Sequence, residues 1–318
     1  MEKNVKILLS ISELDKSFEK MVEILRQYAT VDVVDLINYS LQGYDIFIGK
    51  KLSKSKLLEA DKLKYIFAYK TGVDDFPLTE LDKMGIVLIN SHADSRIIAE
   101  YAFGMSISLV NRINEFDLNL RQGIWYDNEN MYWKSIFCMK VGLLGYGNIG
   151  KDIHKILLQN NIETVTIDRG HQYENIHLVN SLNELINYCD LIICSLPKTQ
   201  LTDKLFNEET FALMKDKFIV NVGRSNVIDE QALYNALKNE TIGGAAIDTW
   251  QEKPKNKRTK LMPSTYSFHD LNNIILSPHA AMRVENGHDR YVMDVTNNVI
   301  GLLTDDVVYN VISYKKGY

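Results

Sequence analysis

The stretch MKVGLLGYGNIGKDIHKILLQ, residues 139–159, decides the fold of one part of the chain. An apolar run ends at Leu144, three glycines follow in the pattern G-x-G-x-x-G, and a helical pattern of apolar residues begins behind them. In such a strand–turn–helix context, Gly145 permits a tight turn and Gly147 lets the backbone approach a pyrophosphate. Gly150 lets the helix pack closely on the strand. The stretch therefore predicts a dinucleotide-binding turn.

The neighbouring residues extend this prediction. Tyr146, Asn148 and Ile149 lie in the turn and at the helix start, where free N–H groups can hold phosphate oxygens. The next predicted strand, ETVTID, ends at Asp168, about 20 residues after the first glycine, where an acid binds the ribose hydroxyls of NAD. Asp168 favours NAD because it repels a 2′-phosphate, whereas Arg169 beside it can accommodate the phosphate of NADP. An S-adenosylmethionine enzyme, which shares a glycine-rich turn and an acid after its second strand, stays open as an alternative.

Strand and helix patterns alternate on both sides of this stretch. Helical patterns occupy 13–28, 94–117 and 282–303. Runs rich in apolar and β-branched residues predict strands at 5–11, 31–36, 44–49, 64–69, 85–90, 140–145, 163–168, 191–196, 217–222, 243–248 and 273–278. Such alternation is typical of parallel sheets with helices on both faces. We therefore expect an α/β fold with two Rossmann-like or flavodoxin-like lobes and a cleft between them.

Composition and charge exclude several classes of protein. A chain of 318 residues is long enough for two domains, and 46% hydrophobic with 24% charged residues is ordinary globular composition. A net charge of −5 argues against a nucleic-acid partner. No apolar run reaches the ~18 residues of a membrane span, and the first residues do not read as a signal peptide. Cys138, Cys189 and Cys194 form no C-x-x-C pair, so we expect a cytoplasmic protein, with no metal site.

Three polar residues follow successive predicted strands in the second half of the chain. Arg224 lies behind FIVNV, Asp248 ends GGAAID, and His279 follows NIILSP with Pro278 directly before it. Ligands of open parallel sheets bind beyond the carboxyl ends of the strands, so these side chains can converge on one site. Taken singly, each has a plainer interpretation: a surface ion pair, a helix or turn cap, and a buried histidine.

With these residues in place, the sequence resembles the D-isomer-specific 2-hydroxyacid dehydrogenase family. The resemblance covers nearly the whole chain and is strongest in KTGVDDFPL (70–78), HADSRIIAEYAFGMSISLVNR (92–112), the glycine turn and SPHAA (277–281). It implies an NAD-dependent oxidoreductase that transfers a hydride between NAD(H) and a small 2-hydroxy acid or 2-keto acid. The alternative is an NAD-binding regulatory protein, or a catalytically weakened member of the family.

The resemblance also implies a domain organisation and an assembly. Residues 1–94 plus 282–318 would form the substrate domain, and residues 95–281 would form the NAD-binding Rossmann domain. The arm LRQGIWYDNENMYWKSIF, residues 120–137, would help to form a homodimer. The expected partner is a small anionic substrate.

Roles for individual residues follow from the same resemblance. The loop Lys70–Thr71–Gly72–Val73 would offer backbone N–H groups to the substrate carboxylate. Arg224 would bind that carboxylate in the bidentate manner that suits a guanidinium group. His279 would donate a proton to the carbonyl oxygen and remove it in the reverse direction. The remaining positions would contact the cofactor, with Leu196 and Pro197 on the adenine side and Val222, Gly223 and Asp248 towards the nicotinamide.

One position departs from the family. A glutamate usually occupies the position of Lys253, next to Pro254, where it stabilises the charged form of the histidine. A lysine there would disfavour that form. Three explanations remain open: Glu252 takes the place of the missing carboxylate, the histidine works without one, or the enzyme is weak or inactive. Lys70 and Lys253 could instead serve a more strongly anionic substrate.

Overall fold

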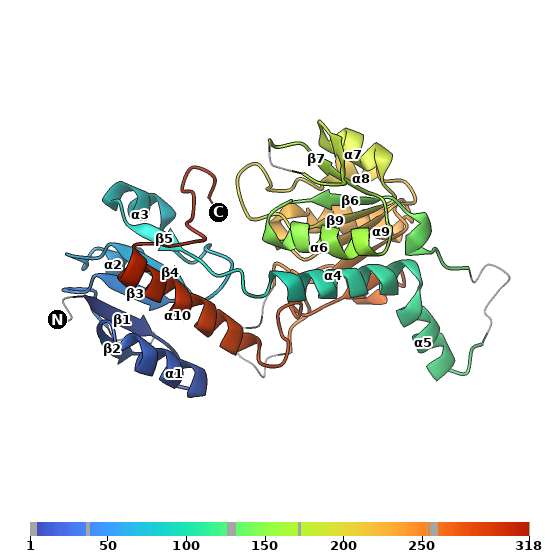
Figure 1. The fold of residues 1–318 in the computed structure, drawn as a ribbon. Coiled ribbons are helices and arrows are strands. Elements are labelled where there is room, and N and C mark those ends of the chain that lie inside the picture. Colours follow the sequence, from blue (N-terminus) through green and yellow to red (C-terminus); the bar gives the residue numbers. More distant parts are fainter. Residues whose placement is uncertain are drawn as a thin grey trace. The chain divides into compact units, whose positions relative to one another are not determined.

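The computed structural model describes residues 5–35, 39–125, 132–170, 173–252, 254 and 260–317. The chain divides into two compact units, each with its own parallel sheet (Figure 1). Unit 1 comprises Met1–Asp94 together with Glu285–Tyr318, and unit 2 comprises Ser95–Val284. The predicted α/β class with parallel sheets is confirmed. The second boundary falls after Val284, a few residues beyond the position expected from the sequence.

Unit 1 contains a five-stranded parallel sheet with the strand order β2-β1-β3-β4-β5, as in flavodoxin-like folds. Its elements are β1 (Lys6–Ser10), α1 (Lys16–Leu25), β2 (Thr30–Val34), β3 (Ile46–Gly49), α2 (Lys54–Leu57), β4 (Tyr65–Ala68), α3 (Leu78–Met84), β5 (Val87–Ile89) and α10 (Gly287–Asp305). Strands β3 and β4 are almost wholly buried, which explains why they read as continuous apolar runs rather than as alternating patterns.

Helix α10 belongs to unit 1 although it follows unit 2 in the sequence. It packs against α1 and β4 (Figure 1). At this contact the ring of His288 lies 4.9 Å from that of Phe18, and His288 Nε2 lies 3.1 Å from the Asp15 carboxylate. Ser17 donates to Asp289 nearby. Two segments far apart in the sequence therefore share one hydrophobic core.

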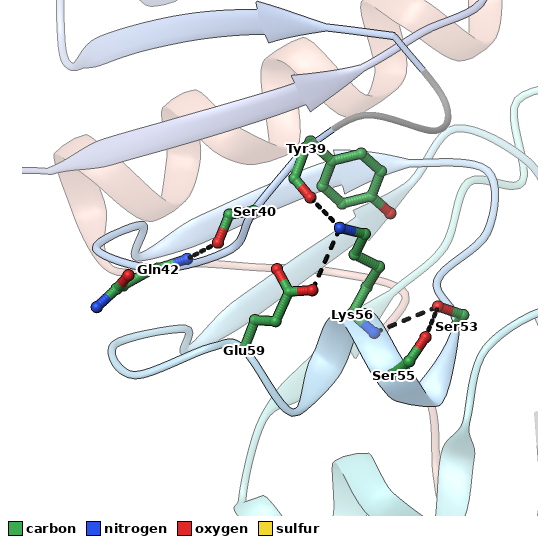
Figure 2. A network of polar contacts seen from close by, with 7 residues as sticks. All are labelled: Tyr39, Ser40, Gln42, Ser53, Ser55, Lys56 and Glu59. Atoms are coloured by element: carbon green, nitrogen blue, oxygen red, sulfur yellow. Dashed lines mark hydrogen bonds and ion pairs between the residues drawn. The ribbon is translucent and has the colours of Figure 1, made fainter.

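A surface network fixes the short helix α2 (Figure 2). Ser53 is the N-cap residue, and its hydroxyl accepts a hydrogen bond from the Lys56 N–H at 3.3 Å. The Lys56 ammonium group contacts the Tyr39 carbonyl and lies 3.2 Å from the Glu59 carboxylate. Burial, together with the charge of Glu59, raises the pKa of Tyr39. The network thus links α2 to the segment that precedes β3.

Unit 2 contains a seven-stranded parallel sheet with the order β12-β11-β10-β9-β6-β7-β8. Its elements are α4 (Ser95–Val110), α5 (Ile113–Arg121), β6 (Val141–Leu144), α6 (Asn148–Gln159), β7 (Thr164–Ile167), β8 (His177–Val179), α7 (Leu182–Tyr188), β9 (Leu191–Cys194), α8 (Glu208–Ala212), β10 (Phe218–Asn221), α9 (Glu230–Lys238), β11 (Gly244–Ile247) and β12 (Ile274–Leu276). The chain runs outward from β6 in one direction and then from β9 in the other. The strand order reverses between these neighbours, which is the switch point where such sheets bind ligands.

Alternate strand residues of unit 2 serve two separate cores. Ile192 and Ile219 belong to a cluster beneath α7, α8 and α9, whereas Ile193 and Val220 belong to a cluster beneath α4 and α6. The period of two along each strand places successive side chains on opposite faces of the sheet. Burial on both faces explains the runs of Leu, Ile and Val that identified these strands.

One helix prediction needs correction, and one strand was not predicted. The helix expected over 94–117 is two helices, because Arg112 adopts a left-handed conformation with φ 56° between α4 and α5. Strand β8 was not predicted; it has three residues, and His177 and Leu178 are exposed. Among the described residues, no helix has both the length and the apolar character needed to cross a membrane.

Candidate active site

The glycine turn lies between β6 and α6. Gly145 has φ 99°, a conformation that glycine adopts without a steric penalty. A Cβ atom on Gly150 would overlap the carbonyl oxygen of Gly145, so the first turn of α6 packs directly on the loop backbone. A Cβ on Gly147 would meet no described atom within 4 Å. Two glycines are thus required by internal packing or conformation, whereas the third faces open space.

This turn fits a pyrophosphate group. Gly147 is the N-cap residue of α6 and has no side chain to cap the helix. The first N–H groups of an α-helix lack partners within the helix, and the positive end of the helix dipole attracts anions. The open space at Gly147 lets a phosphate approach these groups closely. The residues present at the turn therefore match the predicted ligand.

Asp168 follows β7 and is exposed at the end of the strand. One carboxylate oxygen accepts a hydrogen bond from the Gly170 N–H at 2.8 Å, which fixes the turn. Sequence reasoning missed Tyr173, whose hydroxyl accepts from the Arg169 N–H at 2.8 Å and whose ring lies 5.1 Å from that of Tyr146. Tyr173 therefore ties the predicted ribose-binding acid to the glycine turn.

The loops that follow β6, β9 and β10 are packed backbone to backbone. The Ser195 hydroxyl donates to the Gly145 carbonyl oxygen at 3.1 Å. A Cβ on Gly223 would lie 2.6 Å from the Leu196 carbonyl oxygen, so a larger residue would push these loops apart. Pro197 is half-buried next to Leu196, while Val222 is buried. The predicted adenine-side and nicotinamide-side residues thus border one loop cluster at the switch point.

Arg224 is partly exposed behind β10, and its Nη1 donates to the Gly223 carbonyl oxygen at 3.1 Å. Asn221, which is fully buried, holds this segment: its Nδ2 donates to the Arg224 carbonyl oxygen at 3.1 Å, and its Oδ1 accepts from the Gly223 N–H at 3.0 Å. Sequence reasoning did not identify Asn221, although a polar residue at the end of a buried strand is a signal that could have found it.

Asp248 and His279 lie behind β11 and β12. The Asp248 carboxylate is 2% exposed and accepts hydrogen bonds from the N–H groups of Ala280 at 2.7 Å and Ala281 at 3.2 Å. His279 has a left-handed backbone with φ 56°. Strands β10, β11 and β12 are neighbours in that order. Arg224, Asp248 and His279 are therefore at one edge of one sheet.

The structure describes only part of the segment around position 253, where the family usually has a glutamate. Glu252, the possible substitute carboxylate, is exposed. Lys253 lies outside the described residues. The substitute role of Glu252 stays a prediction.

In unit 1 the loop 70–73 follows β4 and is anchored through its carbonyl groups. The Ser91 N–H donates to the Lys70 carbonyl oxygen at 3.2 Å, and Asn90 Nδ2 donates to that of Thr71 at 2.6 Å. Val73 is buried, and Gly72 is half-buried. Anchoring by carbonyl groups is the arrangement that a loop needs if its N–H groups are to bind a ligand.

Side chains around this loop are paired as well. Lys70 Nζ forms an ion pair with Asp75. The Thr71 hydroxyl donates to the Ser91 carbonyl oxygen at 3.0 Å, and it lies 3.2 Å from the phenol hydroxyl of Tyr291. Burial raises the pKa of Tyr291 to about 12, so this hydroxyl stays neutral at physiological pH. Asn90 and Tyr291 were not singled out from the sequence, because nothing in a linear pattern shows that they meet Thr71.

Cysteine chemistry has no support at this edge of the unit 2 sheet. Cys194 ends β9 close to the loop cluster, and burial raises its pKa to about 12. Burial raises the pKa of Cys189 to about 12 as well. Both thiols therefore stay protonated, and a protonated thiol is a poor nucleophile.

A parallel sheet whose strand order reverses beside a glycine turn, with an acid at the end of the next strand, defines a dinucleotide-binding α/β protein. Residues 103–281 match the family model described as "D-isomer specific 2-hydroxyacid dehydrogenase, NAD binding domain". The chain belongs to the D-isomer specific 2-hydroxyacid dehydrogenase family. The resemblance noted from the sequence and the predicted nicotinamide cofactor are confirmed.

Curated relatives carry related names. The chain is 27% identical to the D-3-phosphoglycerate dehydrogenase of Methanocaldococcus jannaschii over 97% of its own length and 59% of that protein. It is 27% identical to the glyoxylate reductase of Thermofilum pendens over 81% of this chain and 77% of that one. The chain thus spans little more than half the length of the phosphoglycerate dehydrogenases that it matches.

Solved structures show the same fold. An acyclic imino acid reductase (Bsp5) in complex with NADPH and D-Arg matches with a TM-score of 0.81 and 24% identity, over 97% of this chain and 100% of that one. D-Lactate dehydrogenase from Aquifex aeolicus, complexed with NAD and lactic acid, matches with a TM-score of 0.79 and 22% identity, over 94% of this chain and 96% of that one. At these identities the likeness establishes the fold.

Proposed function

We propose that the protein is an NAD-dependent oxidoreductase that interconverts a small 2-keto acid and the corresponding 2-hydroxy acid. The observation that carries the proposal is the placement of Arg224, Asp248 and His279 behind three neighbouring strands. The glycine turn lies behind β6 in the same parallel sheet, and thus at the same edge. A guanidinium group, a buried carboxylate and an imidazole at the ligand-binding edge of a dinucleotide-binding sheet suit hydride transfer to a carbonyl group.

Each residue has one task in this mechanism. A bound reduced nicotinamide supplies a hydride. The Arg224 guanidinium group binds the substrate carboxylate through two parallel N–H donors and so orients the keto group. His279 donates a proton to the carbonyl oxygen as the hydride reaches the carbon, and it takes the proton back during oxidation of the alcohol. The net reaction consumes one keto acid, one NADH and one proton, and it yields the hydroxy acid and NAD.

In this proposal, the backbone N–H groups of the loop 70–73 of unit 1 donate further hydrogen bonds to the substrate carboxylate. The support for this contact is the anchoring of the Lys70 and Thr71 carbonyl groups by Ser91 and Asn90, which fixes the loop backbone. The ion pair of Lys70 with Asp75 partly neutralises the lysine, so a strongly anionic substrate is not required. We therefore propose a monocarboxylate keto acid as the substrate class.

The proposal is tested with purified protein and NADH. Glyoxylate, pyruvate, hydroxypyruvate, 3-phosphohydroxypyruvate and 2-ketoisocaproate are compared by the loss of absorbance at 340 nm. Turnover of one or more of the unphosphorylated keto acids supports the proposal, whereas turnover of 3-phosphohydroxypyruvate alone contradicts the monocarboxylate class. Tight NADH binding without turnover on the whole panel contradicts the proposed activity and favours the alternative of an NAD-binding protein without catalysis. Binding of S-adenosylmethionine, with no response to NADH, would indicate a methyltransferase.

Comparison of Lys253→Ala with the unaltered protein separates the two substrate classes. If Lys253 serves an anionic group, the variant loses activity on the phosphorylated keto acid more than on pyruvate. An equal loss on both removes that idea. A gain on both indicates that the lysine disfavours the charged form of His279.

The preference for NAD rests on Asp168. We expect Asp168→Ala to weaken NADH binding by tenfold or more, because a hydrogen bond to a charged group contributes about 1.5–3 kcal/mol. NADPH binding should be unchanged or tighter, because the repulsion of the 2′-phosphate is lost. Fluorescence titration with both cofactors measures the two affinities.

Arg169→Ala is the matched control for this prediction, because it changes the neighbouring exposed side chain. It should weaken NADPH binding and leave NADH binding nearly unchanged. Equal NADH affinity in Asp168→Ala and the unaltered protein would show that Asp168 does not contact the ribose.

We propose a homodimer formed through the arm 120–137 together with helix α5, which leads into it; residues 126–131 of the arm lie outside the described part. Helix α5 contains no buried residue. Large apolar side chains along this segment are exposed, including Leu118 at 58%, Trp125 at 70%, Trp133 at 55% and Phe137 at 65%. Exposed large apolar side chains along one segment suit a protein interface, and a second copy of the chain is the partner that we propose.

We also propose a cytoplasmic location. Its support is that the three cysteines are all free thiols.

Replacing Trp133 with aspartate is expected to shift the protein from dimer to monomer, because a charge placed in an apolar interface loses its hydration. Light scattering after size-exclusion chromatography measures the mass. Leu58→Asp, at a residue 69% exposed on unit 1, is the control and should leave the mass unchanged. A mass near 36.5 kDa for the unaltered protein would contradict the homodimer.

A further inference from the structure

The backbone of His279 has a conformation that residues with a side chain adopt at a cost. Its φ of 56° lies in the left-handed region, which is sterically disfavoured for a residue with a side chain. It persists only where surrounding contacts hold it, and such residues cluster at functional sites. The contacts on both sides of His279 therefore hold its backbone in place.

Asp248 holds the residues that follow His279. Its Oδ1 accepts from the Ala280 N–H at 2.7 Å and its Oδ2 accepts from the Ala281 N–H at 3.2 Å. Hydrogen bonds to a charged acceptor are about twice as strong as those between neutral groups, and this carboxylate is buried. These two hydrogen bonds fix the backbone of Ala280 and Ala281. A carboxylate has about four acceptor positions, so Asp248 can still accept a hydrogen bond from a cofactor.

Ser277 holds the residues that precede His279. Its carbonyl oxygen accepts from Trp250 Nε1 at 3.0 Å, and its N–H donates to the Ile247 carbonyl oxygen at 2.9 Å. Its hydroxyl donates to the Asp248 carboxylate and lies 2.9 Å from the Tyr101 hydroxyl. Pro278, between Ser277 and His279, has a fixed φ and removes further freedom.

The direction of the hydrogen bonds in this cluster is determined by chemistry. An ionised carboxylate only accepts, so the single hydroxyl proton of Ser277 points to Asp248. The Tyr101 hydroxyl must therefore donate to Ser277 Oγ. The result is a directed chain from Tyr101 on α4, through Ser277 behind β12, to Asp248 behind β11.

We infer that these contacts form a clamp, made of Tyr101, Asp248, Trp250 and Ser277, that holds the His279 turn in its left-handed conformation. The inference rests on the proposed function, in which His279 is the proton donor. Asp248, Ser277, Tyr101 and Trp250 are then positioning residues, because they act on the substrate through His279. The clamp holds the backbone and does not require a carboxylate beside the imidazole ring. The clamp therefore positions the histidine independently of the residue at position 253.

Three variants test the clamp: Asp248→Asn, Ser277→Ala and Tyr101→Phe. The first readout is the hydrogen-exchange rate of the Ala280 and Ala281 amides, measured by NMR on the protein without cofactor or substrate. We expect at least tenfold faster exchange in Asp248→Asn and Ser277→Ala, and a smaller increase in Tyr101→Phe. Unchanged rates in all three variants would overturn the clamp.

The second readout separates positioning from cofactor binding. A displacement of a reacting group by about 1 Å can cost 10²-fold in rate, so we expect kcat of Asp248→Asn to fall by 10- to 100-fold. The dissociation constant for NADH should stay within twofold. A tenfold weaker NADH affinity with nearly unchanged kcat and unchanged amide exchange would instead identify Asp248 as a cofactor contact only.

Two substitutions serve as matched controls. Ser106→Ala removes a buried serine hydroxyl from α4 that donates to Ala102, and Tyr314→Phe removes a tyrosine hydroxyl from unit 1. Neither should change the exchange of Ala280 and Ala281. If the unaltered protein turns over no keto acid, the proposed function fails, and the amide exchange still decides whether the clamp exists.

Discussion

Replacing His279 with alanine is expected to lower kcat for keto-acid reduction by about 10²- to 10⁴-fold, the range lost when a general acid is removed. The imidazole is the proton donor in the proposed mechanism, and water replaces it poorly because it is neither positioned nor matched in pKa. Stopped-flow measurement of NADH oxidation under saturating keto acid determines the loss.

NADH affinity provides the control for this variant. The glycine turn and Asp168 are at loops other than that of His279, so His279→Ala should bind NADH within a few-fold of the unaltered protein. Arg224→Ala should behave differently, with a raised KM for the keto acid, because it removes the group that binds the carboxylate. A His279→Ala variant that retains full kcat would remove the histidine from the mechanism.

Alanine substitution at Gly150 and at Gly147 should weaken cofactor binding in both cases, but only the change at Gly150 should lower the stability of the protein. In Gly150→Ala the new methyl group overlaps the Gly145 carbonyl oxygen, which is backbone and cannot rotate away. Such overpacking costs about 1–3 kcal/mol and sometimes more, and each kcal/mol lowers Tm by roughly 2–4 °C in a domain of this size. We therefore expect a clear fall in Tm together with weak NADH binding.

Gly147→Ala is the matched variant, because its methyl group meets no described atom within 4 Å. Its Tm should stay close to that of the unaltered protein, while NADH affinity falls because the methyl group occupies the space for the pyrophosphate. Differential scanning calorimetry and fluorescence titration measure the two quantities. Equal NADH affinity in Gly147→Ala and the unaltered protein would place the pyrophosphate elsewhere.

The sequence predicted most strands because their burial on both faces leaves a clear apolar pattern. Runs such as 191–196 and 217–222 correspond to the buried strands β9 and β10. The three-residue strand β8 was not predicted, because two of its side chains are exposed and the segment therefore has no run of apolar residues. The break at Arg112 was missed as well, since apolar periodicity continues across it and only the left-handed backbone ends α4.

The candidate site was predictable where its residues follow strands in a parallel sheet. Arg224 and His279 could be placed at one edge from strand order alone. The contacts of Asp248 could not, because two of its hydrogen-bond donors lie 32 and 33 positions later and are backbone groups that any residue type can supply. Asn221 and Tyr173 were missed for the same reason: they hold backbone groups, and their roles depend on how loops meet.

The return of the chain to unit 1 after unit 2 sets an order for biosynthesis. Residues 95–284 are translated before α10, so the sheet of unit 1 lacks the helix that covers part of it while unit 2 is being synthesised. Nascent unit 1 thus exposes the apolar surface of α1 and β4 throughout the synthesis of its neighbour. The unit that begins first is the last to be completed, and a chaperone has its longest opportunity to bind there.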